Sequence, residues 1–379
     1  MKLFPDAPIY TLMYDETYCG NIFPKNTIHQ SCFSLPSQRI YTITRKQRFS
    51  LPFMQKSIKK LDFSEYDIVL VSSSWFAHML KKSWAKTLVY YHAPARYMWD
   101  WTHEYRKEIW MNRWIRGFLY GAFMKSLRIQ DYHAAQNHDI ILANSTTTQK
   151  RILKYYRKES EVLYPPIETE RFAKNIPKVE IWDILKHIIE WLIESQSPIG
   201  RVSRNNMLNI FQNWDYYIIL SALTEFKRLD VALKNFREIS DTNLVIIGKG
   251  DYRQELEKMS QNAQNIFFTG AQYRNDLVAL VQNSMGLIFP WEEDFGIVPI
   301  EVMAAGKPVF ALKKWGLTET ILEWKTWEFF CDSEGKDFIE NFEVFHQNNL
   351  TWKYDPEDCK NRARQYDKKV FEEKTLSYI

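Results

Sequence analysis

One stretch of the sequence, residues 289–309, places charged residues in a pattern that could bind an anion. The apolar run 286–289 predicts a buried strand, an acidic loop with one glycine follows it, and Pro299 lies where a helix can begin. In a parallel α/β sheet such a loop lies at the carboxyl end of a strand, where the N–H groups of the helix start face the ligand crevice. Glu293 on the loop and Glu301 in the helix are eight positions apart, so both can face one crevice. The pattern indicates an anionic ligand beside two carboxylates and a helix start.

The sequence lacks the patterns of several other kinds of site. The four cysteines show no C-x-x-C spacing, so neither a zinc site nor a disulfide framework is indicated. His78, His103, His133 and His138 have no H-E-x-x-H or comparable spacing. The segment 248–250 is not a phosphate-binding Walker sequence, and no G-x-S-x-G elbow exists. We therefore predict neither a metal site nor a bound cofactor.

Length and charge limit the class of protein. A chain of 379 residues predicts two or three domains. Its 50 basic and 46 acidic residues are too balanced to indicate nucleic acid binding, although the net charge of +4 is compatible with weak attraction to anionic lipid. No apolar run is long enough to span a bilayer, and the first residues lack the pattern of a signal peptide. The expected location is the cytoplasm, with peripheral contact at the inner face of the cytoplasmic membrane as an open alternative.

Strands alternate with helices along the first part of the chain, which favours a parallel, doubly wound α/β sheet. The helix patterns are 101–137 and 146–156, and Asn144 with Ser145 forms a good cap for the second. Pro165 and Pro166 then end regular structure. The predicted strands are 9–13, 66–71, 88–91, 140–143 and 162–164.

The same alternation begins again after residue 213, which predicts a second α/β domain and a cleft between the two. The predicted strands are 216–221, 243–248, 266–270 and 286–289. The predicted helices between and after them are 231–239, 252–262, 276–283 and one that begins at Pro299. The expected division is an N-terminal domain over 1–172, a linker or insertion over 173–213, a C-terminal domain over 214–364, and a C-terminal helix, 365–379, returning to the N-terminal domain.

An ordered set of segments resembles the retaining glycosyltransferases of family 4, which have the GT-B fold. The stretch 289–309 is similar to their E-x7-E signature. Other segments resemble a bacterial subgroup that includes O-antigen mannosyltransferases of the WbaZ type, and the resemblance runs from Leu3 to about Phe371. These segments are His92–Asp100 (HAPARYMWD), Ala143–Ser145 (ANS), Tyr164–Ile167 (YPPI) and Ser221–Asp230 (SALTEFKRLD).

The resemblance implies a fold and a reaction. The fold is two Rossmann-like doubly wound domains facing a central cleft. The reaction is metal-independent transfer of a hexose from a nucleotide sugar to a lipid-linked or polysaccharide acceptor in bacterial polysaccharide or lipopolysaccharide biosynthesis. Mannose from GDP-mannose is the preferred donor, while a UDP-sugar donor and an inactive sugar-nucleotide-binding homologue remain the alternatives.

The resemblance also implies roles for single residues. Lys227 and Arg228 would hold positive charge over the diphosphate as the glycosidic bond breaks, although a Lys-Arg pair after a strand is also typical of a solvated turn. Glu293 would lie near the donor sugar hydroxyls, Glu301 would accept hydrogen bonds from the ribose, and His92 would lie beside the transferred sugar.

The remaining implied positions surround the donor and the acceptor. Arg96 would meet an acceptor phosphate, or else bridge to Asp100 as an ordinary helix-start arginine. The backbone N–H groups near the sugar and phosphates would be those of Phe295, Gly296 and Ile297, and the base would lie at Phe268, Gly270 and Gln272, where a plain turn is the alternative.

Three features depart from the family pattern. The start of the chain resembles the segment that follows the family's first strand and Gly-Gly loop, so we expect about thirty residues of one βα unit to be missing, and activity to be reduced. Residues 314–320 keep a single glycine of a Gly-Gly pair, and Trp315 is expected to crowd the phosphate approach. Ala222 stands where many members have arginine, so one phosphate contact is absent or supplied by Arg228.

The segment 173–213 is longer than a usual connection between domains. Within 179–196, four apolar residues form one helical stripe: Trp182, Leu185, Ile189 and Leu192. We expect this stripe to pack on one of the two domains, and contact with a membrane surface is the alternative.

Overall fold

The computed structural model describes residues 3–12, 14, 16, 22–23, 27–30, 51–74, 76–100, 114–174, 176–177, 183–187, 189–190, 210, 215–239, 241–321 and 327–379. The chain forms two compact units. The N-terminal unit contains Met1–Leu163 and Lys374–Ile379, and the C-terminal unit contains Tyr164–Glu373.

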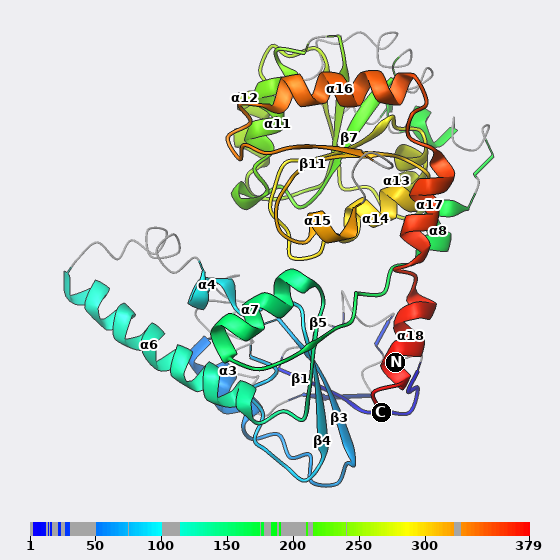
Figure 1. The fold of residues 1–379 in the computed structure, drawn as a ribbon. Coiled ribbons are helices and arrows are strands. Elements are labelled where there is room, and N and C mark those ends of the chain that lie inside the picture. Colours follow the sequence, from blue (N-terminus) through cyan, green and yellow to red (C-terminus); the bar gives the residue numbers. More distant parts are fainter. Residues whose placement is uncertain are drawn as a thin grey trace. The chain divides into compact units, whose positions relative to one another are not determined.

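The N-terminal unit is an α/β structure built on parallel strands. Its four-stranded sheet has the order β3-β4-β5-β6, with β3 at Ile68–Ser73, β4 at Lys86–Tyr91, β5 at Ile140–Ala143 and β6 at Glu161–Val162. A separate pair, β1 (Ile9–Thr11) and β2 (Ile28–Gln30), is also parallel. The helices are α3 (Leu51–Ile58), α4 (Arg96–Trp99), α6 (Trp114–Gln136) and α7 (Thr146–Tyr156) (Figure 1).

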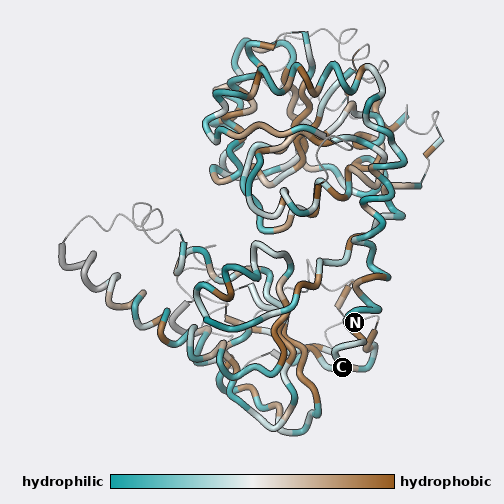
Figure 2. The backbone as a smooth tube through the Cα atoms, viewed as in Figure 1, coloured by the Kyte–Doolittle hydropathy of each residue, from teal (hydrophilic) through white to brown (hydrophobic). Residues whose placement is uncertain are grey.

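Local sequence signals account for several of these elements. The strand β5 and the helix α7 have the predicted bounds, and the Ser145 side chain accepts a hydrogen bond from the Thr148 N–H at 3.0 Å, as expected of an N-cap. The apolar strands lie inside the unit, as the brown segments of Figure 2 show. The first part of the predicted helix 101–137 lies outside the described residues.

The C-terminal unit is built on a six-stranded parallel sheet with the order β12-β11-β10-β7-β8-β9. Counted from its first strand, the sheet has the order 3-2-1-4-5-6, which is that of a doubly wound dinucleotide-binding fold. The direction of winding reverses between β7 and β10, which are direct neighbours. The bounds are β7 Tyr216–Leu220, β8 Asn243–Ile247, β9 Ile266–Gly270, β10 Gly286–Phe289, β11 Val309–Leu312 and β12 Trp327–Phe330.

Helices surround this sheet, and its strands are almost fully buried, which explains why their sequences are mainly apolar (Figure 1). The labelled helices of this unit are α8 (Thr169–Ala173), the short 3-10 turn η3 (Glu225–Lys227), α11 (Leu229–Phe236), α12 (Arg253–Met259), α13 (Arg274–Gln282), α14 (Ile297–Ala304), α15 (Leu317–Thr320), α16 (Phe338–Leu350) and α17 (Pro356–Arg364). The last helix, α18 (Lys368–Leu376), begins in this unit and ends in the N-terminal unit. The helix α14 begins two residues before Pro299, the predicted start.

The boundary between the two units lies at Leu163 rather than near residue 172. Ile167 and Phe172 belong to the core of the C-terminal unit, because their side chains pack among its strands and helices. Part of the predicted linker does the same: Leu185 and Ile189, two members of the predicted stripe, are 1% and 0% exposed in that core. The other two members of the stripe lie outside the described residues.

The chain end belongs to the N-terminal unit from Lys374 onward. There the Tyr378 hydroxyl donates to the Glu161 carboxylate at 2.9 Å, and its carbonyl accepts from Lys86 Nζ at 3.2 Å. Among the helices that the structure describes, none is both long and apolar enough to cross a bilayer.

Candidate active site

The point where the winding of the C-terminal sheet reverses brings two predicted residues together. Lys227 lies in η3, after β7, and Glu293 lies in the loop after β10. Although they are 66 residues apart in sequence, the Lys227 ammonium and the Glu293 carboxylate form an ion pair. The pair arises because β7 and β10 are neighbours and end at the same edge of the sheet.

Trp291 holds this pair in place. Its indole N–H donates to the same Glu293 oxygen at 3.1 Å, and the Lys227 ammonium lies 4.9 Å from the centre of its ring. The ring itself is buried against Phe289. The side chains of Lys227 and Glu293 are 26% and 31% exposed, so a ligand can reach both. Lys227 and Glu293 are thus held together at the carboxyl edge of the sheet.

Arg228, the other predicted phosphate-binding cation, is directed elsewhere. Its backbone is left-handed, with φ of 44°, and its guanidinium donates to both carboxylate oxygens of Glu334 at 3.1 Å. Asp230 accepts a further bond from Arg228 Nε at 3.2 Å. Arg228 could hold a phosphate only by exchanging these two carboxylates for it.

The start of α14, where the sequence predicts backbone contacts to an anion, follows the loop of Glu293. Gly296 caps the helix with φ of +89°, a left-handed conformation that is strained for any residue with a side chain and so favours glycine. The Phe295 ring is buried against Tyr164 and Tyr366, and the Ile297 side chain is 47% exposed. The N–H groups of Phe295, Gly296 and Ile297 lie at the helix start, where the helix dipole favours an anion.

Glu301 lies in the same helix and is mostly buried. Burial raises its pKa to about 7, and the positive charge of Arg171 on α8 acts in the opposite direction. A carboxyl group in this range changes between the neutral and ionised forms near neutral pH. Its capacity to accept hydrogen bonds from a ligand then depends on pH.

The single glycine of the segment 314–320 has a defined structural role. The Gly316 N–H donates to the Glu293 carbonyl at 3.0 Å, and a Cβ on Gly316 would lie 2.1 Å from the Asp294 carbonyl oxygen. Trp315 is half-buried and left-handed, with φ of 53°. The loop of Glu293 is thus fixed through its backbone by the one glycine that the sequence retains.

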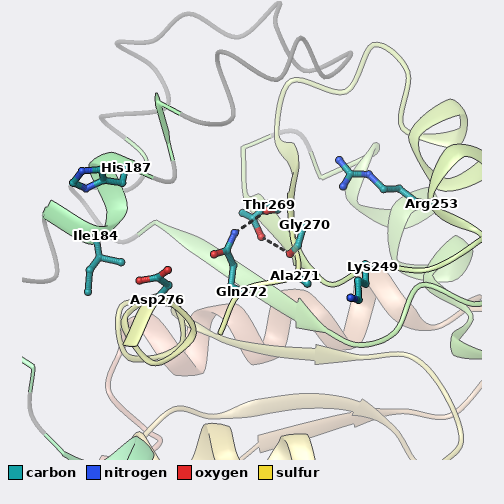
Figure 3. A pocket seen from close by; sticks show the side chains of 9 residues that line it. All are labelled: Ile184, His187, Lys249, Arg253, Thr269, Gly270, Ala271, Gln272 and Asp276. Carbon is teal, nitrogen blue, oxygen red and sulfur yellow. Dashed lines mark hydrogen bonds between the residues drawn. The ribbon is translucent and has the colours of Figure 1, made fainter. Parts of the chain in front are cut away.

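A pocket of about 610 Å³ opens beside the loops that follow β8 and β9 (Figure 3). Two residues predicted near the base, Gly270 and Gln272, line it, and the Gln272 amide donates to the Thr269 carbonyl at 2.8 Å. Sequence reasoning missed its other polar residues: His187, Lys249, Arg253, Thr269 and Asp276.

The two glycines on either side of Lys249, Gly248 and Gly250, could have indicated from the sequence that loops pack closely beside this pocket. A Cβ on Gly248 would lie 1.8 Å from the Ser221 carbonyl oxygen, and one on Gly250 would lie 2.1 Å from that of Leu223. Both glycines therefore let the loops after β7 and β8 approach closely. The segment 248–250 is a packing motif at the sheet edge and could have been identified as such.

His92 and Arg96 lie in the N-terminal unit, at the carboxyl end of β4. His92 Nε2 shares a hydrogen bond of 2.8 Å with the Ser72 hydroxyl, and burial lowers the pKa of the imidazole, which favours the neutral ring. The Asp100 carboxylate is hydrogen-bonded by Arg151 and Tyr155. Each of the two groups of predicted residues is thus placed within its own unit.

No three histidine, cysteine, aspartate or glutamate side chains within the described ranges are grouped so that they could hold a metal ion.

Known proteins resemble this chain at the level of sequence. Residues 204–366 match the family model described as glycosyl transferases group 1. The chain is 27% identical to the alpha-1,3/1,6-mannosyltransferase ALG2 of Dictyostelium discoideum over 54% of its own length and 51% of that protein. It is 30% identical to the GDP-mannose-dependent alpha-(1-6)-phosphatidylinositol monomannoside mannosyltransferase of Mycolicibacterium smegmatis over 29% of its own length and 32% of that protein. The chain thus spans about half, or less, of the length of these relatives.

Solved structures resemble it at the level of fold. Anabaena HepE, solved in complex with UDP and glucose, superimposes with a TM-score of 0.53 at 14% identity, covering 78% of this chain and 87% of that one. The shared architecture is the GT-B fold, with two Rossmann-like α/β domains, as the sequence predicted. Residues 204–366 are therefore similar to the glycosyl transferases group 1 family, within a chain of GT-B fold.

Proposed function

We propose that this protein is a retaining, metal-independent glycosyltransferase of family 4, related to the WbaZ-type mannosyltransferases. It transfers a hexose from a nucleotide sugar to a lipid-linked or polysaccharide acceptor during the synthesis of a cell-surface glycan. The observation that carries this proposal is the Lys227–Glu293 ion pair, which lies where the winding reverses and next to the start of the helix that bears Glu301.

The geometry suits the departure of a nucleoside diphosphate. Negative charge grows on the diphosphate as the glycosidic bond breaks, and a nearby cation stabilises that charge most in the transition state. Lys227 supplies the cation, and the N–H groups at the start of α14 supply further donors. When the diphosphate takes over Lys227, Glu293 becomes available to accept hydrogen bonds from hydroxyls of the donor sugar.

Two further residues have proposed roles, one in each unit. Glu301, in its ionised form, accepts hydrogen bonds from the ribose hydroxyls of the nucleotide. In the N-terminal unit, His92 is hydrogen-bonded to Ser72 and favours the neutral form, and the family resemblance gives it a role beside the transferred sugar. With a lipid-linked acceptor, the enzyme would work at the cytoplasmic face of a membrane.

Mannose from GDP-mannose is the preferred donor. The two relatives reported above are named as mannosyltransferases, and one of them as GDP-mannose-dependent. A UDP-sugar is the second candidate, because Anabaena HepE was solved with UDP and glucose.

Donor binding and transfer can be measured separately on the purified chain. We expect GDP to raise its melting temperature more than UDP, and label to pass from GDP-[14C]mannose into the lipid fraction of membranes, with and without EDTA. Transfer from UDP-sugars alone would establish the second candidate. Nucleotide binding without transfer from any of several sugar donors would indicate an inactive homologue, and loss of transfer in EDTA would contradict metal independence.

A further inference from the structure

One wall of the pocket beside β8 and β9 comes from the stretch 173–213, which the sequence alone marked as a linker or insertion. Residues 183–187 and 189–190 are helical. Leu185 and Ile189, four positions apart, face the core of the C-terminal unit and are fully buried. Ile184 and His187, three positions apart, line the pocket, and Ile184 is also partly buried against the same core (Figure 3). This helical segment, which we call the wall helix, is therefore anchored on one face and presents the other to the pocket.

The wall helix and its neighbours offer hydrogen-bond acceptors. His187 Nδ1 lies 2.7 Å from the Asp183 carbonyl oxygen and donates to it, so Nε2 of the neutral ring is an acceptor. The Gln272 amide nitrogen donates to the Thr269 carbonyl, so the Gln272 side-chain oxygen is also an acceptor. Asp276, in the first turn of α13, adds a carboxylate to the same pocket.

The basic residues of the pocket lie apart from these acceptors. Figure 3 shows Lys249 and Arg253 on one side of the loop 269–272, while Ile184, His187 and Asp276 lie on the other. This distribution of charge favours one orientation of a bound nucleotide. The anionic phosphates would lie on the basic side of the pocket, and the neutral base would lie on the other side.

We propose that the wall helix forms part of the base-binding wall of the donor pocket and, together with Gln272 and Asp276, selects guanine over uracil. Guanine presents two neighbouring donors, N1–H and the 2-amino group, to which the acceptors of this pocket are complementary. Uracil presents one N–H between two carbonyl oxygens, and these would face the acceptors without a partner, which is unfavourable. Ile184 packs on the face of the purine. This inference rests on the proposed function, since it names the nucleotide of that same donor site.

The test is calorimetric titration of the purified full chain with GDP, IDP, UDP and pyrophosphate. IDP lacks only the 2-amino group of guanine, so it isolates that contact. We expect GDP to bind at least tenfold more tightly than UDP, and severalfold more tightly than IDP. Asp276→Ala and His187→Ala should each weaken GDP binding about tenfold and leave pyrophosphate binding unchanged.

Two further variants separate recognition from folding. Lys186→Ala changes an exposed residue of the wall helix that does not line the pocket, and it should bind GDP as the unaltered chain does. Ile184→Gln should weaken both GDP and IDP, with an unchanged melting temperature as its control. Asp276 lies on a different element from Ile184, so it reports on the base even if the wall helix is disturbed.

The outcomes distinguish the two proposals. Tighter binding of UDP than GDP, or equal GDP affinity in the His187 and Asp276 variants, would overturn guanine selection, while transfer from a UDP-sugar would still support a glycosyltransferase. Failure to bind any nucleoside diphosphate, together with failure to transfer any sugar, would overturn both.

Discussion

Two groups of polar side chains, one in each unit, lie near the carboxyl ends of strands and differ in their access to solvent. In the N-terminal unit, Ser73 at the end of β3 bonds His78 Nδ1 at 2.9 Å, and His78 Nε2 lies 2.9 Å from Asp131 of α6. These are the residue types of a nucleophilic triad. All three are sealed in the core, however, with exposures of 1%, 1% and 0%. No substrate can reach them, so this chain of contacts stabilises the fold.

The C-terminal unit leaves its charges within reach of a ligand. Lys227 and Glu293 keep about a quarter to a third of their side chains exposed. The comparison shows that residue types alone do not make a site, because access and spare bonding capacity decide whether polar groups serve structure or ligand.

The largest predicted effect is on the free energy of unfolding, and it concerns the buried contacts of Ser73, His78 and Asp131. The Asp131 carboxylate also accepts bonds from the Trp99 indole at 2.7 Å and the Tyr156 hydroxyl at 2.8 Å. Asp131→Ala would leave these buried donors without an acceptor, so the free energy of unfolding should fall by about 3–5 kcal/mol. Urea unfolding followed by tryptophan fluorescence measures it. Asp62→Ala, on the surface, is the control, and an equal midpoint for the two variants would contradict the structural role.

The next effect is on catalysis. Lys227→Ala should lower turnover about a hundredfold or more, because its charge acts mainly as the diphosphate leaves. Steady-state transfer kinetics measure this, with Lys258→Ala, from an exposed pair with Glu255, as the matched control. If turnover stays near that of the unaltered chain while only KM rises, Lys227 binds the donor without contributing to the chemical step.

A tenfold effect is expected at Glu301. Glu301→Ala should weaken nucleotide binding at least tenfold, since one charge-assisted hydrogen bond is worth about 1.5–3 kcal/mol. The variant should still fold at pH 8. Because the pKa of Glu301 is raised to about 7 in the folded chain, this carboxyl group lowers the free energy of unfolding as pH rises from its unfolded pKa towards 7. Replacing Glu301 with alanine removes that loss of stability. Calorimetry on GDP and UDP decides the point, and unchanged affinity for both would remove Glu301 from the site.

The smallest effect concerns the pH at which Glu301 ionises. Nucleotide affinity should rise as pH increases through about 7, because the ionised carboxylate is the better acceptor for ribose hydroxyls. Arg171 donates to the Arg274 carbonyl at 3.4 Å, and its charge favours the ionised form. Arg171→Met should move the midpoint of this profile to higher pH, with a severalfold loss of affinity at pH 6.5 and little loss at pH 8.5. A uniform loss at every pH would indicate a purely structural contact.

The sequence predicted the local elements well where several signals coincide. The bounds of β5, the Ser145 cap and α7 follow from an apolar run, a capping residue and helix-forming residues next to one another. The E-x7-E stretch was placed correctly on a strand, a loop and a helix for the same reason. The ion pair of the Arg228 side chain could not be predicted, because its partner Glu334 is 106 residues away in sequence.

The sequence by itself thus determined the alternation of strands and helices, the glycines that permit close approach, and the residue types at the ends of β7 and β10. Only the tertiary structure decided which of those residues meet. The sheet order makes β7 and β10 neighbours and so joins Lys227 to Glu293, while burial assigns Ser73, His78 and Asp131 to the core. The physical reason is that hydrophobic periodicity acts over a few residues, whereas strand order and solvent access arise from packing of the whole unit.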